Sequence, residues 1–255
     1  MLGSPELTNY DLRFRLLDIP VRVHPFFWLV TAMIGGSQPL RLTLIFVACV
    51  FVSILVHEYG HGLSSRWLGG EPTEIVLHSM GGLCFSDRAR LSPLSNILVI
   101  AAGPGAGFLL FGFVLAFLNA RYGIQAWDAL AFINIGNGNP MEVVARLEGS
   151  NTALHVVHYM LWINLFWGLF NLLPIWPLDG GQISATFLGT LFPRDGVRWA
   201  HVIALMISGG VAMWALSQKD YFLALFVAYF AMINFQILHS MHDSYRPNRD
   251  SSWGR

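Results

Sequence analysis

The sequence has little charge and almost no cysteine. Of its 255 residues, only 12% are charged while 55% are hydrophobic, and its mean hydropathy is +0.54. A soluble domain carries roughly 25% charged residues, so this composition excludes an ordinary water-soluble protein. The 15 basic and 15 acidic residues cancel, which removes the basic excess expected of a nucleic-acid-binding protein. The two cysteines form no disulfide framework, and we expect Cys49 and Cys84 to be buried or free thiols.

Charge is also absent from six long stretches of the chain. A bilayer span needs about 20 predominantly apolar residues. The charge-free stretches are 23–40, 42–57, 91–120, 149–178, 199–218 and 221–242. We therefore predict an all-α polytopic membrane protein with about six transmembrane helices. The first stretch holds Pro25, Pro39 and two glycines, so we expect it to be short and tilted or partly re-entrant.

The basic residues predict how the spans are oriented. Cytoplasmic loops carry the excess of Lys and Arg. If alternate segments are counted from the N-terminus, 11 of the 15 basic residues fall in one set of segments. This places both termini in the cytoplasm, with an N-terminal segment 1–22, a membrane-embedded core 23–242 and a cytoplasmic tail 243–255. The first 22 residues lack the hydrophobic run of a cleavable signal peptide, and we expect residence in the cell (inner) membrane.

The second span ends in a pattern that binds metals. The helix expected over 42–56 runs directly into His57, Glu58 and His61. Residues four apart share one face of a helix, so both histidines can direct a ring nitrogen at one ion. The pattern is that of zinc metalloproteases, in which the glutamate is the general base. Charged and polar residues at the end of a membrane helix favour a functional site.

A catalytic zinc site needs a third protein ligand. The fourth span is interrupted by Pro174 and Pro177, which are followed by Asp179 and two glycines. Since proline cannot continue a helix, we expect unwinding near Pro174 and a new short helix from Gln182 onward. Broken backbone at membrane depth occurs where it lines a cavity or is buried in protein. Asp179 is the preferred third ligand, and an ordinary helix N-cap is the alternative interpretation.

The two motifs together resemble the site-2 protease family of zinc-dependent intramembrane metalloproteases. The resemblance rests on residues 57–61 and 171–181, and it extends to Val23-His24-Pro25, Met80-Gly81-Gly82 and Ala102-Gly103-Pro104. It implies one zinc ion per chain, held by His57, His61 and Asp179. It implies that Glu58 activates water for hydrolysis of a peptide bond in or near the transmembrane segment of a membrane-protein substrate. Asn171 would lie near the reacting carbonyl as a hydrogen-bond donor to the oxyanion.

The chain departs from many members of that family in two ways. Gly107 and Phe108 follow the Gly-Pro pair of the third span, where many relatives carry an asparagine. No connection is long enough for an inserted peptide-binding domain or nucleotide-sensing repeats. We therefore expect a minimal catalytic core, regulated by a separate membrane protein or by prior trimming of the substrate. The sequence does not indicate an oligomeric state.

A small cytoplasmic β element is expected near the site. Thr73–Phe85 alternates imperfectly between polar and apolar residues, and Leu12–Leu16 alternates more cleanly. An exposed strand edge there can hold an unwound substrate segment by main-chain pairing.

The remaining histidines are interpreted as polar residues at membrane interfaces. For His155 and His158, three residues apart, a second metal site is the alternative to interfacial packing. For His24 and His78, an approach to the metal site is the alternative. The other residues interpreted as interfacial are His201, His239 and His242.

Two other functions are compatible with the motifs. A zinc or other cation transporter would need ionisable residues along its pathway, and the spans beyond the second and fourth contain almost none. A catalytically silent membrane chaperone of the same fold would be favoured by the loss of Glu58 or of a ligand, and all four residues are present.

Overall fold

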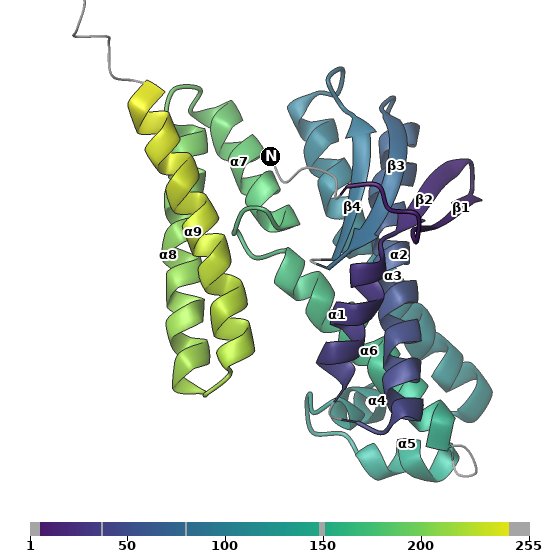
Figure 1. The fold of residues 1–255 in the computed structure, drawn as a ribbon. Helices are drawn as coiled ribbons and strands as arrows, with labels where there is room; N and C mark the ends of the chain where they lie inside the picture. The colour runs from purple at the N-terminus through teal and green to yellow at the C-terminus, as the bar shows by residue number, and fades with distance from the viewer. Residues whose placement is uncertain (1–5, 37, 80, 148–150, 245–255) are drawn as a thin grey trace, which may run out of the picture. The chain divides into compact units, whose positions relative to one another are not determined.

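The computed structural model describes residues 6–36, 38–79, 81–147 and 151–244, so Met80 and most of the expected tail lie outside the described residues. The chain forms two compact units, Met1–Phe170 and Asn171–Arg255, which are described separately (Figure 1). The elements of the N-terminal unit are β1 (Leu12–Leu16), β2 (Ile19–Val23), α1 (Pro25–Gly35), α2 (Leu40–Trp67), β3 (Glu71–His78), β4 (Gly81–Asp87), α3 (Pro93–Tyr122), α4 (Ala126–Phe132), α5 (Pro140–Arg146) and α6 (Asn151–Asn171), whose last residue begins the second unit. The C-terminal unit continues with α7 (Asp179–Leu191), α8 (Gly196–Ser217) and α9 (Tyr221–Ser244).

Among the residues that the structure describes, five helices are long and apolar enough to cross a membrane, namely α2, α3, α6, α8 and α9. The first predicted span forms only the 11-residue helix α1. At 1.5 Å per residue α1 measures about 16 Å, roughly half the thickness of a hydrocarbon core. It is short because Gly36 caps its end and Pro39 already caps the start of α2. The chain is thus a multi-pass membrane protein, whose described part contains five long apolar helices and one short one.

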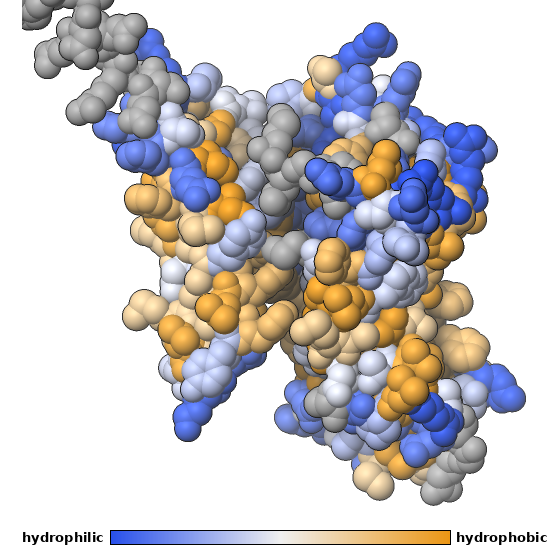
Figure 2. Space-filling model, in the orientation of Figure 1, coloured by the Kyte–Doolittle hydropathy of each residue, from blue (hydrophilic) through white to orange (hydrophobic). Residues whose placement is uncertain are grey.

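The outer surfaces of these helices are hydrophobic. Only 22–33% of the most hydropathic window of each long helix is buried. Leu109 on α3, Met213 on α8 and Leu225 on α9 are all more than 70% exposed. Figure 2 shows hydrophobic residues over the middle of the α8–α9 pair and hydrophilic residues at its two ends. A soluble protein rarely exposes apolar patches of this extent, so the surface is suited to lipid.

The β element is a four-stranded sheet in the order β1-β2-β3-β4. β1 pairs antiparallel with β2, β2 pairs parallel with β3, and β3 pairs antiparallel with β4. The strand expected at Leu12–Leu16 is confirmed as β1, and the stretch Thr73–Phe85 is divided between β3 and β4. The sequence prediction missed β2, which contains Pro20.

The sheet packs on α1 and α2. One core cluster joins Ile19, Val21 and Val23 of β2 to Ile75 and Leu77 of β3, and to Phe27, Ile54 and Tyr59 of the helices. A second cluster holds α4 and α5 against α3 and α6; it contains Leu118, Ile124, Ala129, Ile133, Val143, Leu147 and Leu161. The first cluster fixes the end of α2 that carries the predicted metal motif against the sheet.

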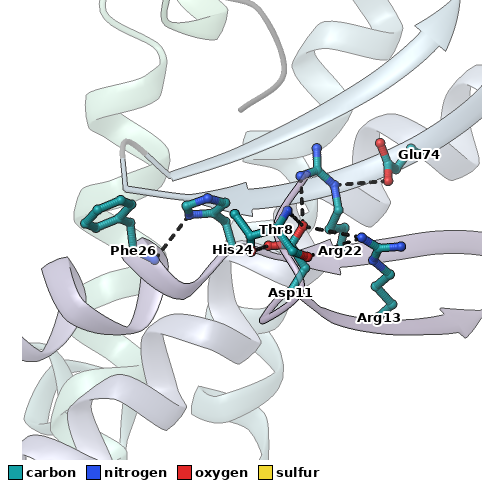
Figure 3. A network of polar contacts seen from close by, with 7 residues as sticks. All are labelled: Thr8, Asp11, Arg13, Arg22, His24, Phe26 and Glu74. Atoms are coloured by element: carbon teal, nitrogen blue, oxygen red, sulfur yellow. Dashed lines mark hydrogen bonds and ion pairs between the residues drawn. The ribbon is translucent and has the colours of Figure 1, made fainter. Parts of the chain in front are cut away.

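A buried arginine ties the N-terminal hairpin to β3. Arg22 is 2% exposed and forms ion pairs with Asp11 at 3.2 Å and Glu74 at 3.3 Å (Figure 3). Burial acts to raise the pKa of Asp11, but the hydrogen bonds from Thr8 and the charge of Arg22 outweigh it and lower that pKa below 3.8. The side chain of His24 accepts a hydrogen bond from the Phe26 amide and so caps α1. His24 is therefore a helix cap at this end of the sheet.

Candidate metal centre

The predicted motif lies within an unbroken helix. α2 continues past His57, Glu58 and His61 to Trp67. Gly60 faces α3, because a Cβ built there would lie 2.8 Å from Ala106 Cβ and 2.9 Å from the Ala102 carbonyl carbon. Such distances are too short for any side chain larger than glycine, so Gly60 allows α2 and α3 to approach closely.

The two histidines present their nitrogens to the same point. The Nε2 atoms of His57 and His61 lie 3.2 Å apart. Two nitrogens bound at 2.0–2.1 Å to a tetrahedral ion are separated by about 3.3 Å, so the pair fits a zinc ion. Nδ1 of His61 lies 2.9 Å from the carbonyl oxygen of Val99 on α3. Since a carbonyl only accepts, Nδ1 carries the proton and the lone pair of Nε2 is available to a metal.

Gly103 makes room for the ring of His61. A Cβ on Gly103 would lie 2.8 Å from Cδ2 of His61 and closer still to Cε1 and Nε2. Gly103 of the third span therefore has a packing role beside the predicted metal ligand His61.

Glu58 lies against strand β4. It is 4% exposed, and a Cβ on Gly82 would lie 2.6 Å from its carboxyl carbon. Burial, with the nearby charge of Glu58, raises the pKa of the Cys84 thiol to about 12. The carboxyl group of the predicted base is thus held beside the backbone of the sheet.

His78, the last residue of β3, is a partly buried sheet residue. Its pKa is lowered by burial and by the neighbouring His24 and Arg22. His155 directs Nδ1 at the carbonyl oxygen of Asn151, 2.6 Å away in the same helix. That contact is an ordinary helical one and lends nothing to a second metal site.

The second motif belongs to the C-terminal unit and breaks the helix as expected. α6 ends at Asn171, and α7 begins at Asp179, three residues earlier than the predicted Gln182. Leu178 is the N-cap residue of α7, so the alternative interpretation of Asp179 as an N-cap is wrong. The new helix packs directly on the connection before it, because a Cβ on Gly181 would lie 2.6 Å from the Ile175 carbonyl oxygen.

Two buried asparagines, Asn234 and Asn164, were not singled out from the sequence. The side chain of His201 is 5% exposed, and its Nδ1 lies 2.8 Å from Oδ1 of Asn234, which is fully buried. A lone asparagine inside an apolar span was the available signal, since polar residues are costly in the membrane. In the N-terminal unit, the amide of Asn164 on α6 donates to Ser53 Oγ on α2 at 2.9 Å.

Comparison with known proteins places the chain in a family. The model of Peptidase family M50 matches residues 45–216, which include both motifs. The chain belongs to Peptidase family M50. This M50 protein is 29% identical over 184 residues to Zinc metalloprotease MJ0392 of Methanocaldococcus jannaschii, covering 71% of this chain and 46% of that protein. It is 27% identical over 168 residues to Stage IV sporulation protein FB of Bacillus subtilis, covering 66% of this chain and 47% of that protein. It thus spans about half the length of these relatives.

The fold of the M50 protein agrees with that of a solved structure. The Site-2 Protease from Methanocaldococcus jannaschii aligns with a TM-score of 0.60 at 20% identity, covering 96% of this chain and all of that one. The predicted fold class and the resemblance to site-2 proteases are therefore confirmed.

Proposed function

We propose that this M50 protein is a zinc metalloprotease that hydrolyses a peptide bond in or near the transmembrane segment of a membrane-protein substrate. The observation that carries the proposal is the pair of Nε2 atoms of His57 and His61, 3.2 Å apart, with Glu58 next to His57 on α2. Membership of a peptidase family and the named activity of MJ0392 support the same conclusion.

In this proposal, His57, His61 and Asp179 would hold one zinc ion per chain. Two imidazoles and a carboxylate are a ligand set that zinc enzymes use. When bound, zinc supplies a Lewis acid that polarises a carbonyl and lowers the pKa of water to about 7. Asp179 suits the role of third ligand because it is the first residue of α7 and the acidic residue of that helix's first turn.

The protein side chains carry the proton transfers. Glu58 takes a proton from the attacking water and passes it to the leaving amide nitrogen. The contact of its carboxyl group with Gly82 limits the positions that this side chain can adopt. Asn171, at the end of α6, donates a hydrogen bond to the oxyanion that develops on the scissile carbonyl.

The outer edge of β4 receives the substrate. A transmembrane substrate arrives as a helix, whose carbonyl groups are hydrogen-bonded, so it must unwind before it can be attacked. β4 ends the strand order of the sheet and offers its free edge to main-chain pairing. Because the Glu58 carboxyl group contacts Gly82 of β4, a strand added there passes close to the base.

The protein is expected in the cell (inner) membrane with both termini in the cytoplasm. The asymmetric distribution of its basic residues supports this orientation, as the positive-inside rule requires. A separate membrane protein, or prior trimming of the substrate, would then regulate cleavage.

The test is co-expression with candidate single-span membrane proteins. We expect Glu58→Gln to reduce cleavage by about 100-fold or more, which is the size of a general-base contribution, and to retain zinc. Glu142→Gln is the matched control: Glu142 is a partly exposed glutamate on α5 that pairs with Arg146 of the same helix, and this variant should cleave normally. His57→Ala and Asp179→Ala should lose zinc. Full cleavage by Glu58→Gln, or zinc retained by both ligand variants, would contradict the proposal.

A further inference from the structure

A buried polar pair joins α8 to α9 within the C-terminal unit. Asn234 of α9 is fully buried, and His201 of α8 is 5% exposed. Both lie in helices that are otherwise long and apolar. Burying an amide or an imidazole without hydrogen bonds costs several kcal/mol, so each such group needs partners. The hydrogen-bond partners of these two residues indicate the role of the pair.

The hydrogen bonds fix the orientation of the Asn234 amide. Its Nδ2 donates to the carbonyl oxygen of Trp176 at 2.7 Å and to that of Phe230 at 2.8 Å. Both partners only accept, so the flipped amide would set oxygen against oxygen. Oδ1 therefore faces Nδ1 of His201 at 2.8 Å, and this nitrogen must carry the proton. Both donors of the amide are used, one of them outside α9.

That outside partner lies in the connection before Asp179. Pro174 and Pro177 remove two amide donors from the connection, and its backbone bonds to itself are short-range, such as Leu178 N to Ile175 O at 2.8 Å. The ring of Trp176 also packs edge-on against His201, with ring centroids 5.8 Å apart. Trp176 is thus held by α8 through its ring and by α9 through its carbonyl group.

The position of Trp176 determines where α7 begins. A Cβ on Gly181 would lie 2.6 Å from the Ile175 carbonyl oxygen and closer still to the amide nitrogen of Trp176. The first turn of α7 therefore rests on this part of the connection with no space between them. Asp179 is the first residue of that turn. A shift of Trp176 must move Asp179 with it.

We infer that Asn234 and His201 are positioning residues, which hold the Trp176 carbonyl so that the Asp179 carboxylate is oriented for zinc. The inference rests on the proposed function, because it requires Asp179 to be a ligand. Residues that orient a metal ligand contribute about 10–100-fold to metal affinity. A pair outside both motifs would then control the metal centre from α8 and α9.

The test measures zinc affinity of the full-length protein in detergent, by competition with a chelator. We expect Asn234→Leu and His201→Leu to bind zinc about 10–100-fold more weakly than the wild type. His201→Asn keeps an N–H group at the position of Nδ1 and should restore affinity to within about threefold, whereas Leu cannot. Gln236→Leu removes an exposed amide from α9, the helix of Asn234, and should leave zinc affinity unchanged. The visible absorption of the Co²⁺-substituted protein should differ from wild type in the two leucine variants alone.

The outcomes separate this inference from the proposed function. If the wild type binds no zinc, or if Asp179→Ala binds it as tightly, the proposed function itself fails. If zinc affinity depends on Asp179 but both leucine variants bind zinc within twofold of wild type, the positioning role is refuted. Equal weakness of His201→Asn and His201→Leu would also refute it, because packing rather than the hydrogen bond would be responsible. Should Asn234→Leu fail to fold, this His201 comparison decides alone.

Discussion

Replacement of Gly103 by alanine should weaken zinc binding while leaving the fold intact. The new Cβ would lie 2.8 Å from Cδ2 of His61, and contacts of that kind ordinarily begin at 3.4 Å. The ring must therefore retreat by at least about 0.6 Å, whereas metal–ligand distances tolerate about 0.2 Å. It cannot retreat freely, because Nδ1 is bound to the Val99 carbonyl oxygen at 2.9 Å. Either that bond or the alignment of Nε2 must be lost.

If His61 is one of the three proposed ligands, its loss should weaken zinc binding by at least about 100-fold. Overpacking by one methyl group typically costs about 1–3 kcal/mol, part of which the better helix propensity of alanine offsets. Zinc affinity by chelator competition and thermal unfolding of the metal-free protein measure the two effects separately.

Gly105→Ala is the matched control for this experiment. It lies on the same helix, and a Cβ there would have no atom within 4 Å. It should bind zinc like the wild type. If Gly103→Ala binds zinc within twofold of Gly105→Ala, the ring of His61 does not ligate from the position described, and the reasoning fails.

Three other outcomes are expected. Gly82→Ala should displace the Glu58 carboxyl group, since its Cβ would lie 2.6 Å from the carboxyl carbon; we expect cleavage to fall by about 100-fold while zinc content is unchanged, and an active variant would contradict the contact. The pKa of Asp11 is lowered in the folded protein, so its ionised form stabilises the fold above the ordinary value of 3.8, and this contribution disappears as the pH falls through the folded-state pKa. Between pH 5 and 2.5 the unfolding temperature of Asp11→Asn should therefore decline less than that of the wild type, and parallel declines would count against the ion pair with Arg22. In a Cys49→Ala background, Cys84 should resist alkylation by iodoacetamide at pH 8, because burial and Glu58 raise its pKa to about 12; reaction should appear only on unfolding, and rapid labelling of the folded protein would contradict this.

The parts of the metal centre that follow from local geometry could be predicted from the sequence. His57 and His61 converge because helix periodicity alone places residues four apart on one face. The unwinding between Asn171 and Asp179 follows from two prolines that lack amide donors. Both features depend on the identity of a few neighbouring residues and on no distant contact.

Features that depend on tertiary contacts could not be predicted. β2 was missed because Pro20 interrupts its pattern and because its hairpin turns at Leu17 and Asp18, which take positive φ angles of 49° and 61° without a glycine or asparagine to signal them. The pairing of His201 with Asn234 requires α8 and α9 to lie side by side, which no local pattern in either helix indicates. The same holds for Gly82 and Gly103, because their contacts with Glu58 and His61 depend on β4 and α3 lying beside α2.

The parallel pairing of β2 with β3 has a consequence for how the protein is assembled. Val21 pairs with Ile75, and α1 and α2 lie between these partners in the sequence. The β1–β2 and β3–β4 hairpins are local and can form early, whereas the join between them requires α1 to have led the chain away from the sheet and α2 to have led it back. The sheet therefore closes only after insertion of the helix that carries His57, Glu58 and His61. Until Ile75 emerges during synthesis, the edge of β2 that pairs with β3 stays open.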